Sequence, residues 1–187
     1  MLLTFMVAIA GTSATTEDGR KVQLNDNGTW TEMKAIEPPA TPTECSAIVA
    51  REVDRVTGTA LTAMKAPIAV STDDTTGFIW NLLKNDDGTI IWTTKVFGAS
   101  RCVEDDDKMN ILFTDGSRLE IENDSKYNCD RSFTLYFGGP WGDERTLMTF
   151  ATKQIQIARV WTSNDYLERA PSATQAAQLR AAFACLR

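Results

Sequence analysis

The sequence predicts an α+β fold: a mostly antiparallel, twisted β-sheet with one C-terminal helix packed on it. Two observations support this prediction. Short segments rich in apolar and β-branched residues recur along most of the chain, and turn signals containing Gly, Asn and Asp separate them. Helical spacing of apolar residues is found in the last stretch of the chain. The 187 residues are enough for one domain with a substantial core and a small N-terminal module.

Residues 1–14 form an apolar stretch that ends in small side chains, and we expect a secretory signal peptide here. Ala8-Ile9-Ala10 and Thr12-Ser13-Ala14 are both suitable cleavage triplets. The stretch lacks a basic n-region, so a buried first strand is the alternative. It is too short for a transmembrane helix, and no other stretch of the chain qualifies.

Residues 15–36 are expected to form a small β module. Two turn signals, Asp18-Gly19 and Asn27-Gly28, surround a short strand that has Val22 and Leu24 on one face. The pattern DGRKVxLNxxGTW in this segment resembles a motif found just after the signal peptide in exported proteins of Gram-negative bacteria. That resemblance implies a periplasmic or secreted location and implies no activity.

A Pro-rich segment, residues 37–44, predicts an extended linker of the polyproline type. It is the clearest boundary in the chain, and the main domain therefore comprises residues 45–187. The domain is expected to begin with two strands, residues 47–56 and 60–70, which Thr57-Gly58-Thr59 joins as a hairpin.

A second pair of strands is expected over residues 78–83 and 90–97. Asn85-Asp86-Asp87-Gly88 lies between them and predicts a three-residue turn with Gly last. Apolar residues occur on both faces of these strands, so we expect the pair in the centre of the sheet. Two later strands are expected over residues 133–137 and 154–161, and Leu147 to Phe150, between them, are ambiguous.

Residues 109–121 predict a β-hairpin whose register follows from its apolar pattern. A two-residue Asp115-Gly116 loop would mix polar and apolar residues on each face. A loop of three residues, Thr114 to Gly116, gathers the apolar side chains on one face instead. It pairs Phe113 with Ser117, Ile111 with Leu119 and Met109 with Ile121. Gly116 then occupies the left-handed position of a G1 bulge, so we expect a positive φ there.

The chain is expected to end in a helix that starts after Pro171. Ser172 is a suitable N-cap, and Gln175 completes a capping box. Four apolar residues then recur at helical spacing and should pack on the sheet: Ala176, Leu179, Phe183 and Leu186. Cys185 points away from this stripe, which favours a disulfide at that position.

The four cysteines are Cys45, Cys102, Cys129 and Cys185, and no two of them form a C-x-x-C motif. Such an even set is more typical of disulfides in an exported protein than of a zinc site. Three pairings are possible. We favour Cys102–Cys129, which bracket the hairpin, and Cys45–Cys185, which join the start of the main domain to its end. The alternative is four reduced, buried thiols in a cytoplasmic protein.

The main domain also resembles a group of exported bacterial proteins in several short motifs. They are VDxVTG at residues 53–58, LFTDGSRLE at 112–120, YNCD at 127–130, RVWT at 159–162 and CL at 185–186. The resemblance implies export and disulfide bonds within a β-rich domain, and it implies no particular activity.

Charge and composition exclude several classes of function. The formal net charge is −6 and no Lys/Arg cluster is present, so nucleic acid and anionic membranes are not expected as partners. The chain has no His, which excludes Ser-His-Asp and Cys-His nucleophiles and every metal site that needs an imidazole. Carboxylate chemistry and oxygen-ligated metals are not excluded.

The densest acidic run is the candidate metal site, and it comprises Glu104, Asp105, Asp106 and Asp107. No cofactor is expected, although Ca²⁺ is the ion that such a run could bind, because it prefers several carboxylate and carbonyl oxygens. The run lacks the D-x-D-x-D-G spacing of a calcium loop, and adjacent residues on a strand cannot all face one ion. A solvated acidic loop is therefore the favoured interpretation.

The candidate binding residues lie in a glycine-rich loop and are Gly139, Pro140 and Trp141. An exposed Trp on such a loop could stack on a sugar ring or enter a pocket of a partner. In the competing interpretation, Trp141 folds back as a lid over the edge of the sheet.

These features predict an exported, non-enzymatic protein that binds a ligand or partner, an unknown protein or glycan, at the cell envelope. No catalytic residue is assigned. The alternatives are a carboxylate-dependent hydrolase of envelope or extracellular polymers and a structural stabiliser of an envelope assembly. Two acids with opposed environments in a deep cleft would favour the hydrolase. A flat surface with Trp141 exposed would favour binding.

Overall fold

The computed structural model describes residues 13–15, 21–24, 28–32, 42–73, 75–98, 102–163 and 165–187. The chain divides into two units, residues 1–38 and 39–187. The first unit contains an antiparallel three-stranded sheet of β1 (Ser13–Thr15), β2 (Lys21–Leu24) and β3 (Trp30–Glu32). The expected signal peptide, residues 1–14, lies outside the described residues except for its last two positions, which belong to β1.

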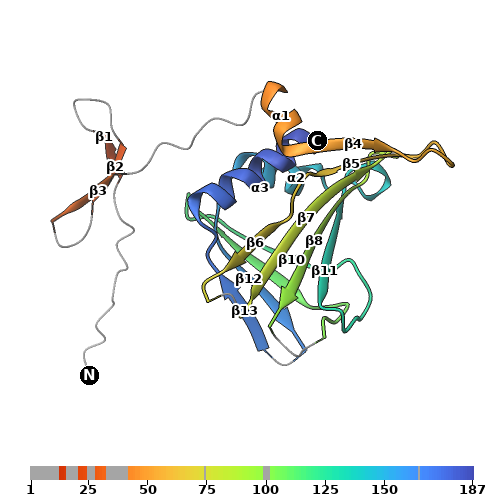
Figure 1. Ribbon diagram of the computed structural model, residues 1–187. Coiled ribbons are helices and arrows are strands. Elements are labelled where there is room, and N and C mark those ends of the chain that lie inside the picture. Colours follow the sequence, from red (N-terminus) through yellow and green to blue (C-terminus); the bar gives the residue numbers. More distant parts are fainter. Residues whose placement is uncertain are drawn as a thin grey trace. The chain divides into compact units, whose positions relative to one another are not determined.

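The second unit contains two antiparallel sheets (Figure 1). The four-stranded sheet has the order β10 (Arg118–Glu122), β9 (Lys108–Phe113), β12 (Ile155–Thr162) and β13 (Asp165–Arg169). The six-stranded sheet has the order β11 (Ser132–Phe137), β8 (Ile90–Phe97), β7 (Gly77–Asn85), β5 (Ala60–Met64) and β4 (Val49–Val53), and β6 (Ile68–Ser71) pairs with β7. The fold class is α+β as predicted, but the strands form two sheets where the sequence suggested one.

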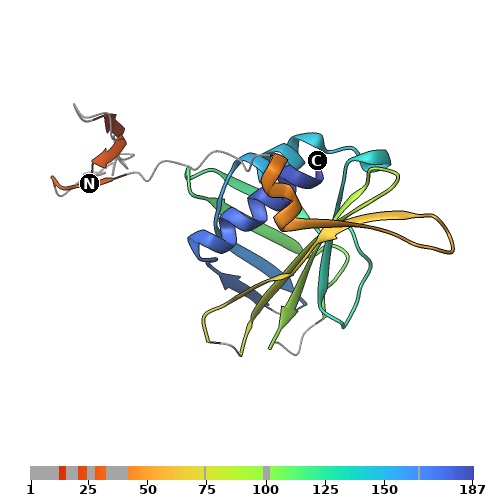
Figure 2. The same cartoon turned by 45° about the horizontal axis from the view of Figure 1, so that its top comes forward.

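Three α-helices lie together at one end of these sheets (Figures 1 and 2): α1 (Pro42–Ile48), α2 (Glu144–Thr152) and α3 (Ala173–Leu186). Helix α3 contacts both other helices and the strands β4 to β7. Trp92 of β8 joins the sheet to the helices, because its ring lies edge-on to Phe150 at 4.9 Å and to Phe183 at 5.3 Å. None of the helices in the described part of the chain has the length and apolar character needed to span a bilayer.

The β9–β10 hairpin has the register that its apolar pattern predicts. Ile111 is paired with Leu119 and Met109 with Ile121. The Phe113 N–H donates to the Ser117 carbonyl at 3.0 Å and closes a three-residue loop. Gly116 has a φ of 81°, so the left-handed position is confirmed.

The C-terminal helix and both disulfides are also confirmed. The Ser172 N–H donates to Gln175 Oε1 at 2.8 Å and the Gln175 N–H to Ser172 Oγ at 3.2 Å, which completes the capping box. The predicted apolar stripe of α3 is buried in the core. Cys45 is bonded to Cys185 and Cys102 to Cys129.

The first expected strands differ from the structure. Ala47 and Ile48 end helix α1 instead of starting a strand. The helix begins at Pro42, whose fixed φ suits a first helical turn, so the last three residues of the expected extended linker are helical. The expected strand over residues 60–70 is divided into β5 and β6. Pro67 lies in the gap between them, and a proline cannot donate to a sheet ladder.

Two elements go beyond the sequence prediction. Helix α2 covers the ambiguous segment between β11 and β12, and Asp143 caps it by accepting from the Thr146 N–H at 3.3 Å. Strand β13 forms a hairpin with β12, in which Trp161 is paired with Tyr166. Both elements are short, and neither has a long apolar pattern.

Candidate binding site

The loop that carries Trp141 follows β11 and contains the 3-10 helix η1 (Gly139–Trp141). The Gly138 N–H donates to the Gly142 carbonyl at 2.7 Å, and the Trp141 N–H donates to the Gly138 carbonyl at 3.0 Å. Gly138, Gly139 and Gly142 all have positive φ, which explains the density of glycine in this loop. The backbone of the loop is therefore closed on itself by hydrogen bonds.

Gly139 also brings this loop against the turn between β7 and β8. A Cβ atom at Gly139 would lie 2.9 Å from Thr89 Oγ1 and 3.1 Å from the Asp87 carbonyl oxygen. Such distances leave no room for a side chain, so the close approach of the two turns needs glycine. The contact fixes the loop that presents Trp141.

The indole of Trp141 stacks on Tyr136 of β11 and is still 62% exposed. The two ring centroids lie 5.3 Å apart with an interplanar angle of 27°. The backbone of Tyr136 is itself fixed, because its N–H donates to Asp124 Oδ2 at 2.9 Å. Trp141 thus folds back over the sheet, as one interpretation expected, and presents an aromatic surface to solvent, as the other expected. Gly139 and Pro140 are exposed beside it.

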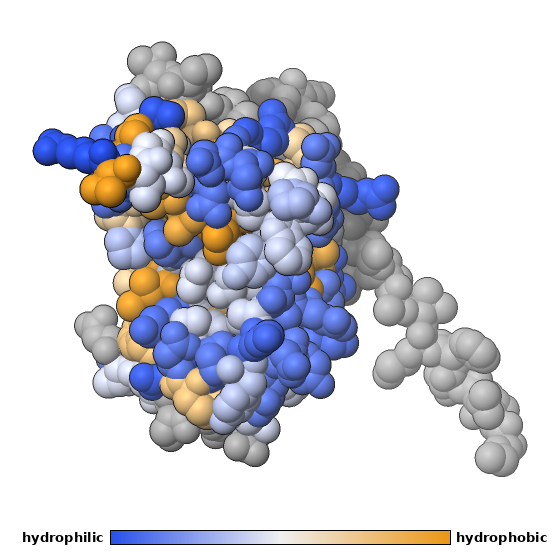
Figure 3. Space-filling view, turned by 90° about the vertical axis from the view of Figure 1, so that its right-hand side faces the viewer, coloured by the Kyte–Doolittle hydropathy of each residue, from blue (hydrophilic) through white to orange (hydrophobic). Residues whose placement is uncertain are grey.

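An apolar row extends from Tyr136 across the outer face of the six-stranded sheet. Its members are half-buried and directly paired on neighbouring strands: Tyr136, Ile91, Leu83 and Ala63. The adjacent positions along three of these strands point into the core instead: Leu135, Trp92 and Leu82. We call Trp141 and this row the Trp141 surface. Figure 3 shows apolar side chains in patches among polar ones on one side of the molecule.

The chain has no significant match among protein-family models, curated proteins or solved structures.

The acidic run Glu104 to Asp107 forms a turn that the side chain of Asp107 stabilises. Asp107 Oδ2 accepts the Glu104 N–H at 2.7 Å. Burial raises the pKa of Asp107, and the charge of Asp106 adds to this effect, although the bond from the Glu104 N–H opposes it. Within the described residues, no three His, Cys, Asp or Glu side chains are placed to hold a metal ion. The geometry of the described residues gives the candidate calcium site no support.

Asn123 directly follows β10 of the four-stranded sheet and connects this turn to β11 of the six-stranded sheet. Its amide nitrogen donates to the Glu104 carbonyl at 2.8 Å, and its amide oxygen accepts the Thr134 N–H at 2.9 Å. The side chain is only 6% exposed, so these bonds are made in a protected environment. Asn123 was not a sequence-derived candidate, because its role depends on two segments that are distant along the chain.

Several carboxylates with a shifted pKa stabilise their own turns. The N–H groups of Thr57 and Val56 lower the pKa of Asp54, and those of Thr76 and Thr75 lower the pKa of Asp73 to about 2. Both residues are exposed and accept bonds within three positions of themselves. These acids act as turn caps, and they give the hydrolase alternative no support.

A second exposed aromatic pair lies on the outer face of the four-stranded sheet. Trp161 and Tyr166 are 38% and 43% exposed, and their rings meet edge to face at 5.1 Å. Trp161 Nε1 donates to Asn110 Oδ1 at 2.8 Å, and the Arg159 guanidinium lies 4.3 Å from the centre of the Tyr166 ring. Because β12 and β13 pair these two aromatic residues directly, a cross-strand packing role accounts for them.

Proposed function

We propose that this protein is an exported, non-enzymatic protein that binds a protein or glycan partner at the cell envelope through the Trp141 surface. The observation that carries the proposal is the stack of Trp141 on Tyr136. A large aromatic side chain that is already held in place loses little conformational entropy when a partner covers it. Trp and Tyr are also the residue types that contribute most to binding energy at interfaces.

The neighbouring row of Ile91 and Leu83 extends this aromatic surface with apolar area. Half-buried aliphatic side chains beside an exposed Trp provide a centre from which water can be excluded, and the polar residues around them can form a rim. The closed glycine loop supports the same proposal, since it keeps Trp141 in one position before the partner arrives.

Export is supported by the cysteines. Two disulfides, Cys45–Cys185 and Cys102–Cys129, are typical of proteins that mature in an oxidising, non-cytoplasmic compartment. The expected signal peptide at residues 1–14 points to the same route. A periplasmic or secreted location follows as part of the proposal.

Binding to isolated envelope fractions tests the role of the Trp141 surface. Co-sedimentation of the purified protein with these fractions should be saturable, and Trp141→Ala should weaken it by at least about tenfold, the range expected of an interface hot spot. Trp161→Ala is the matched control, because Trp161 is an exposed tryptophan on the other sheet. Equal binding by the wild type and Trp141→Ala would contradict the proposal.

Export itself is tested on protein isolated from cell fractions. The proposal expects the chain in the periplasm or the medium, with its N-terminus generated by cleavage near Ala10 or Ala14. Peptide mapping without reductant should recover both disulfides. Free thiols in a chain that keeps its first residues would overturn this part of the proposal.

A further inference from the structure

A pocket of about 330 Å³ lies where the strands β4, β5 and β7 meet the end of helix α3. Its walls include Arg51, Thr62, Lys84, Asp86, Cys185 and Leu186. The volume falls within the range of small-molecule sites, which begins at about 300 Å³. The pocket and the Trp141 surface lie on opposite faces of the six-stranded sheet. Thr62 and Lys84 line the pocket, whereas the next residues on these strands, Ala63 and Leu83, point to the other face.

Three of the lining residues form one row across three neighbouring strands. Arg51 is paired with Thr62, and Thr62 is paired with Lys84. Side chains paired in this way lie on the same face of a sheet, with Cβ atoms about 5 Å apart. The row therefore places a guanidinium and an ammonium on either side of a hydroxyl group.

The two cations have hydrogen-bond donors to spare. Lys84 Nζ donates to the main-chain oxygen of Arg187 at 3.0 Å, and an ammonium has two further N–H groups. The Arg51 side chain makes no hydrogen bond or ion pair with any of the described residues, so its five N–H donors have no partner among them. Among the side chains that line the pocket, Asp86 is a carboxylate beside the two cationic groups of Arg51 and Lys84.

We propose that this pocket binds the oxyanion group, a carboxylate or a phosphate, of a small ligand with an apolar body. Arg51 offers the planar fork that binds two oxygens of such a group at once, and Lys84 adds a point charge from the opposite side. Thr62 provides a hydroxyl donor between them. Leu186, Ala60 and the Cys45–Cys185 disulfide beside the row provide the apolar wall against which the rest of the ligand packs.

Titration of the full-length protein with hexanoate and with hexyl phosphate tests the proposal and separates the two oxyanions. Saturable amide shifts in an NMR spectrum should appear at Arg51, Thr62, Lys84 and Leu186 with at least one of the two probes. Hexanol and hexylammonium have the same apolar body without an anion and should bind at least about tenfold more weakly. Binding of hexylammonium as tight as that of either anion would overturn the proposal.

Arg51→Gln should weaken binding of the preferred probe by about tenfold or more, because charge-assisted hydrogen bonds are lost. Arg55→Gln is the matched control, since Arg55 is an exposed arginine in the same β4–β5 hairpin and outside the pocket. Both positions are exposed, so neither substitution should unfold the protein. Equal binding by the two variants, or absence of saturable shifts at the pocket, would overturn the proposal.

Discussion

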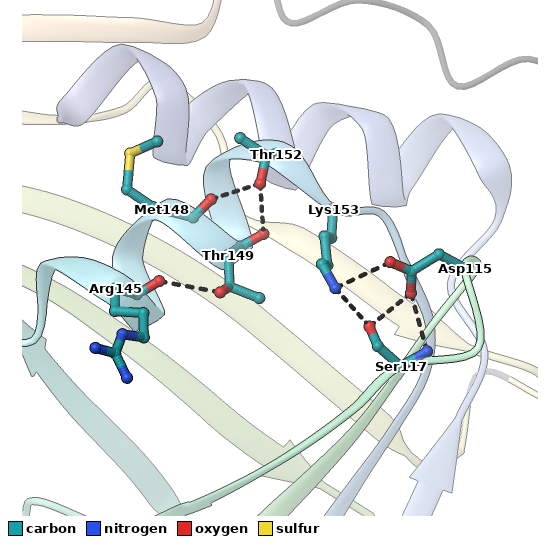
Figure 4. Close-up of polar contacts among 7 residues, drawn as sticks. All are labelled: Asp115, Ser117, Arg145, Met148, Thr149, Thr152 and Lys153. Atoms are coloured by element: carbon teal, nitrogen blue, oxygen red, sulfur yellow. Dashed lines mark hydrogen bonds and ion pairs between the residues drawn. The ribbon is translucent and has the colours of Figure 1, made fainter.

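Lys153 Nζ lies 2.9 Å from Asp115 Oδ2, and this contact ties the turn of the β9–β10 hairpin to the end of helix α2 (Figure 4). The same ammonium donates to Ser117 Oγ at 2.8 Å. Ser117 also donates from its hydroxyl to Asp115 Oδ1 at 2.6 Å. The hydrogen bond from the Ser117 side chain, followed by the one from Lys153, lowers the pKa of Asp115 to about 2.

Lys153→Met should lower the free energy of unfolding by about 0.5–1 kcal/mol at neutral pH, as expected for a partly exposed ion pair. Urea unfolding measures this loss, and Lys126→Met is a control at an exposed lysine with no ion pair among the described residues. The pH dependence gives a second readout. Because the folded-state pKa of Asp115 is depressed, its contribution is present above the ordinary value near 4 and is lost as the pH falls towards 2.

The loss of stability between pH 4 and pH 2 should therefore be smaller in Lys153→Met than in the wild type. Urea midpoints at pH 2, 3, 4 and 5 would measure the difference. Parallel curves for the two proteins would show that Lys153 does not contribute to the shifted pKa of Asp115.

The two disulfides should contribute unequally to stability. Cys45–Cys185 closes a sequence separation of 140 residues and Cys102–Cys129 one of 27. In the chain-entropy description, the longer loop contributes about 5 kcal/mol and the shorter about 3.5 kcal/mol. Replacing both members of each pair by Ala and comparing unfolding free energies tests this order. A larger loss on removal of Cys102–Cys129 would mean that local contacts around the hairpin outweigh loop closure.

Asn123→Ala should cost about 2–4 kcal/mol, because it leaves the buried Thr134 N–H on β11 without its partner and removes the shorter of two hydrogen bonds to the Glu104 carbonyl. The Thr134 N–H and the Glu104 carbonyl are the groups affected. Asn110→Ala is the control, since Asn110 bonds only to partly exposed side chains on the outer face of the four-stranded sheet. Equal losses for the two variants, measured by thermal or urea unfolding, would contradict the assigned role of Asn123.

Local sequence patterns predicted the β9–β10 hairpin and the C-terminal helix correctly. The register of the β9–β10 hairpin follows from a strand period of two residues, because a shift by one would have moved Ile111 and Phe113 to the solvent face. The capping box at Ser172 and the stripe of α3 are equally local. Helix α2 was missed because its threonines are weak helix formers, and only the cap at Asp143 marks its start.

Features that depend on pairing between distant segments could not be predicted from local sequence patterns. Trp141 was recognised as a candidate from its loop, but its partner Tyr136 and the row through Ile91 require the order of the strands. The pocket depends on Arg51 and Lys84, which are brought to one face by strands that are not adjacent in sequence. No local motif marks either residue.

Gly139→Ala should disturb the Trp141 surface, whereas Gly116→Ala should affect only its own hairpin. Both glycines have positive φ, but a Cβ at Gly139 would press on Thr89, and nothing lies within 4 Å of a Cβ at Gly116. We expect a cost of about 1 kcal/mol for Gly116→Ala, from the backbone conformation alone, and a larger cost for Gly139→Ala. NMR shifts of the Trp141 indole N–H give the structural readout. An unchanged indole signal in Gly139→Ala would show that the contact with the β7–β8 turn does not fix the position of Trp141.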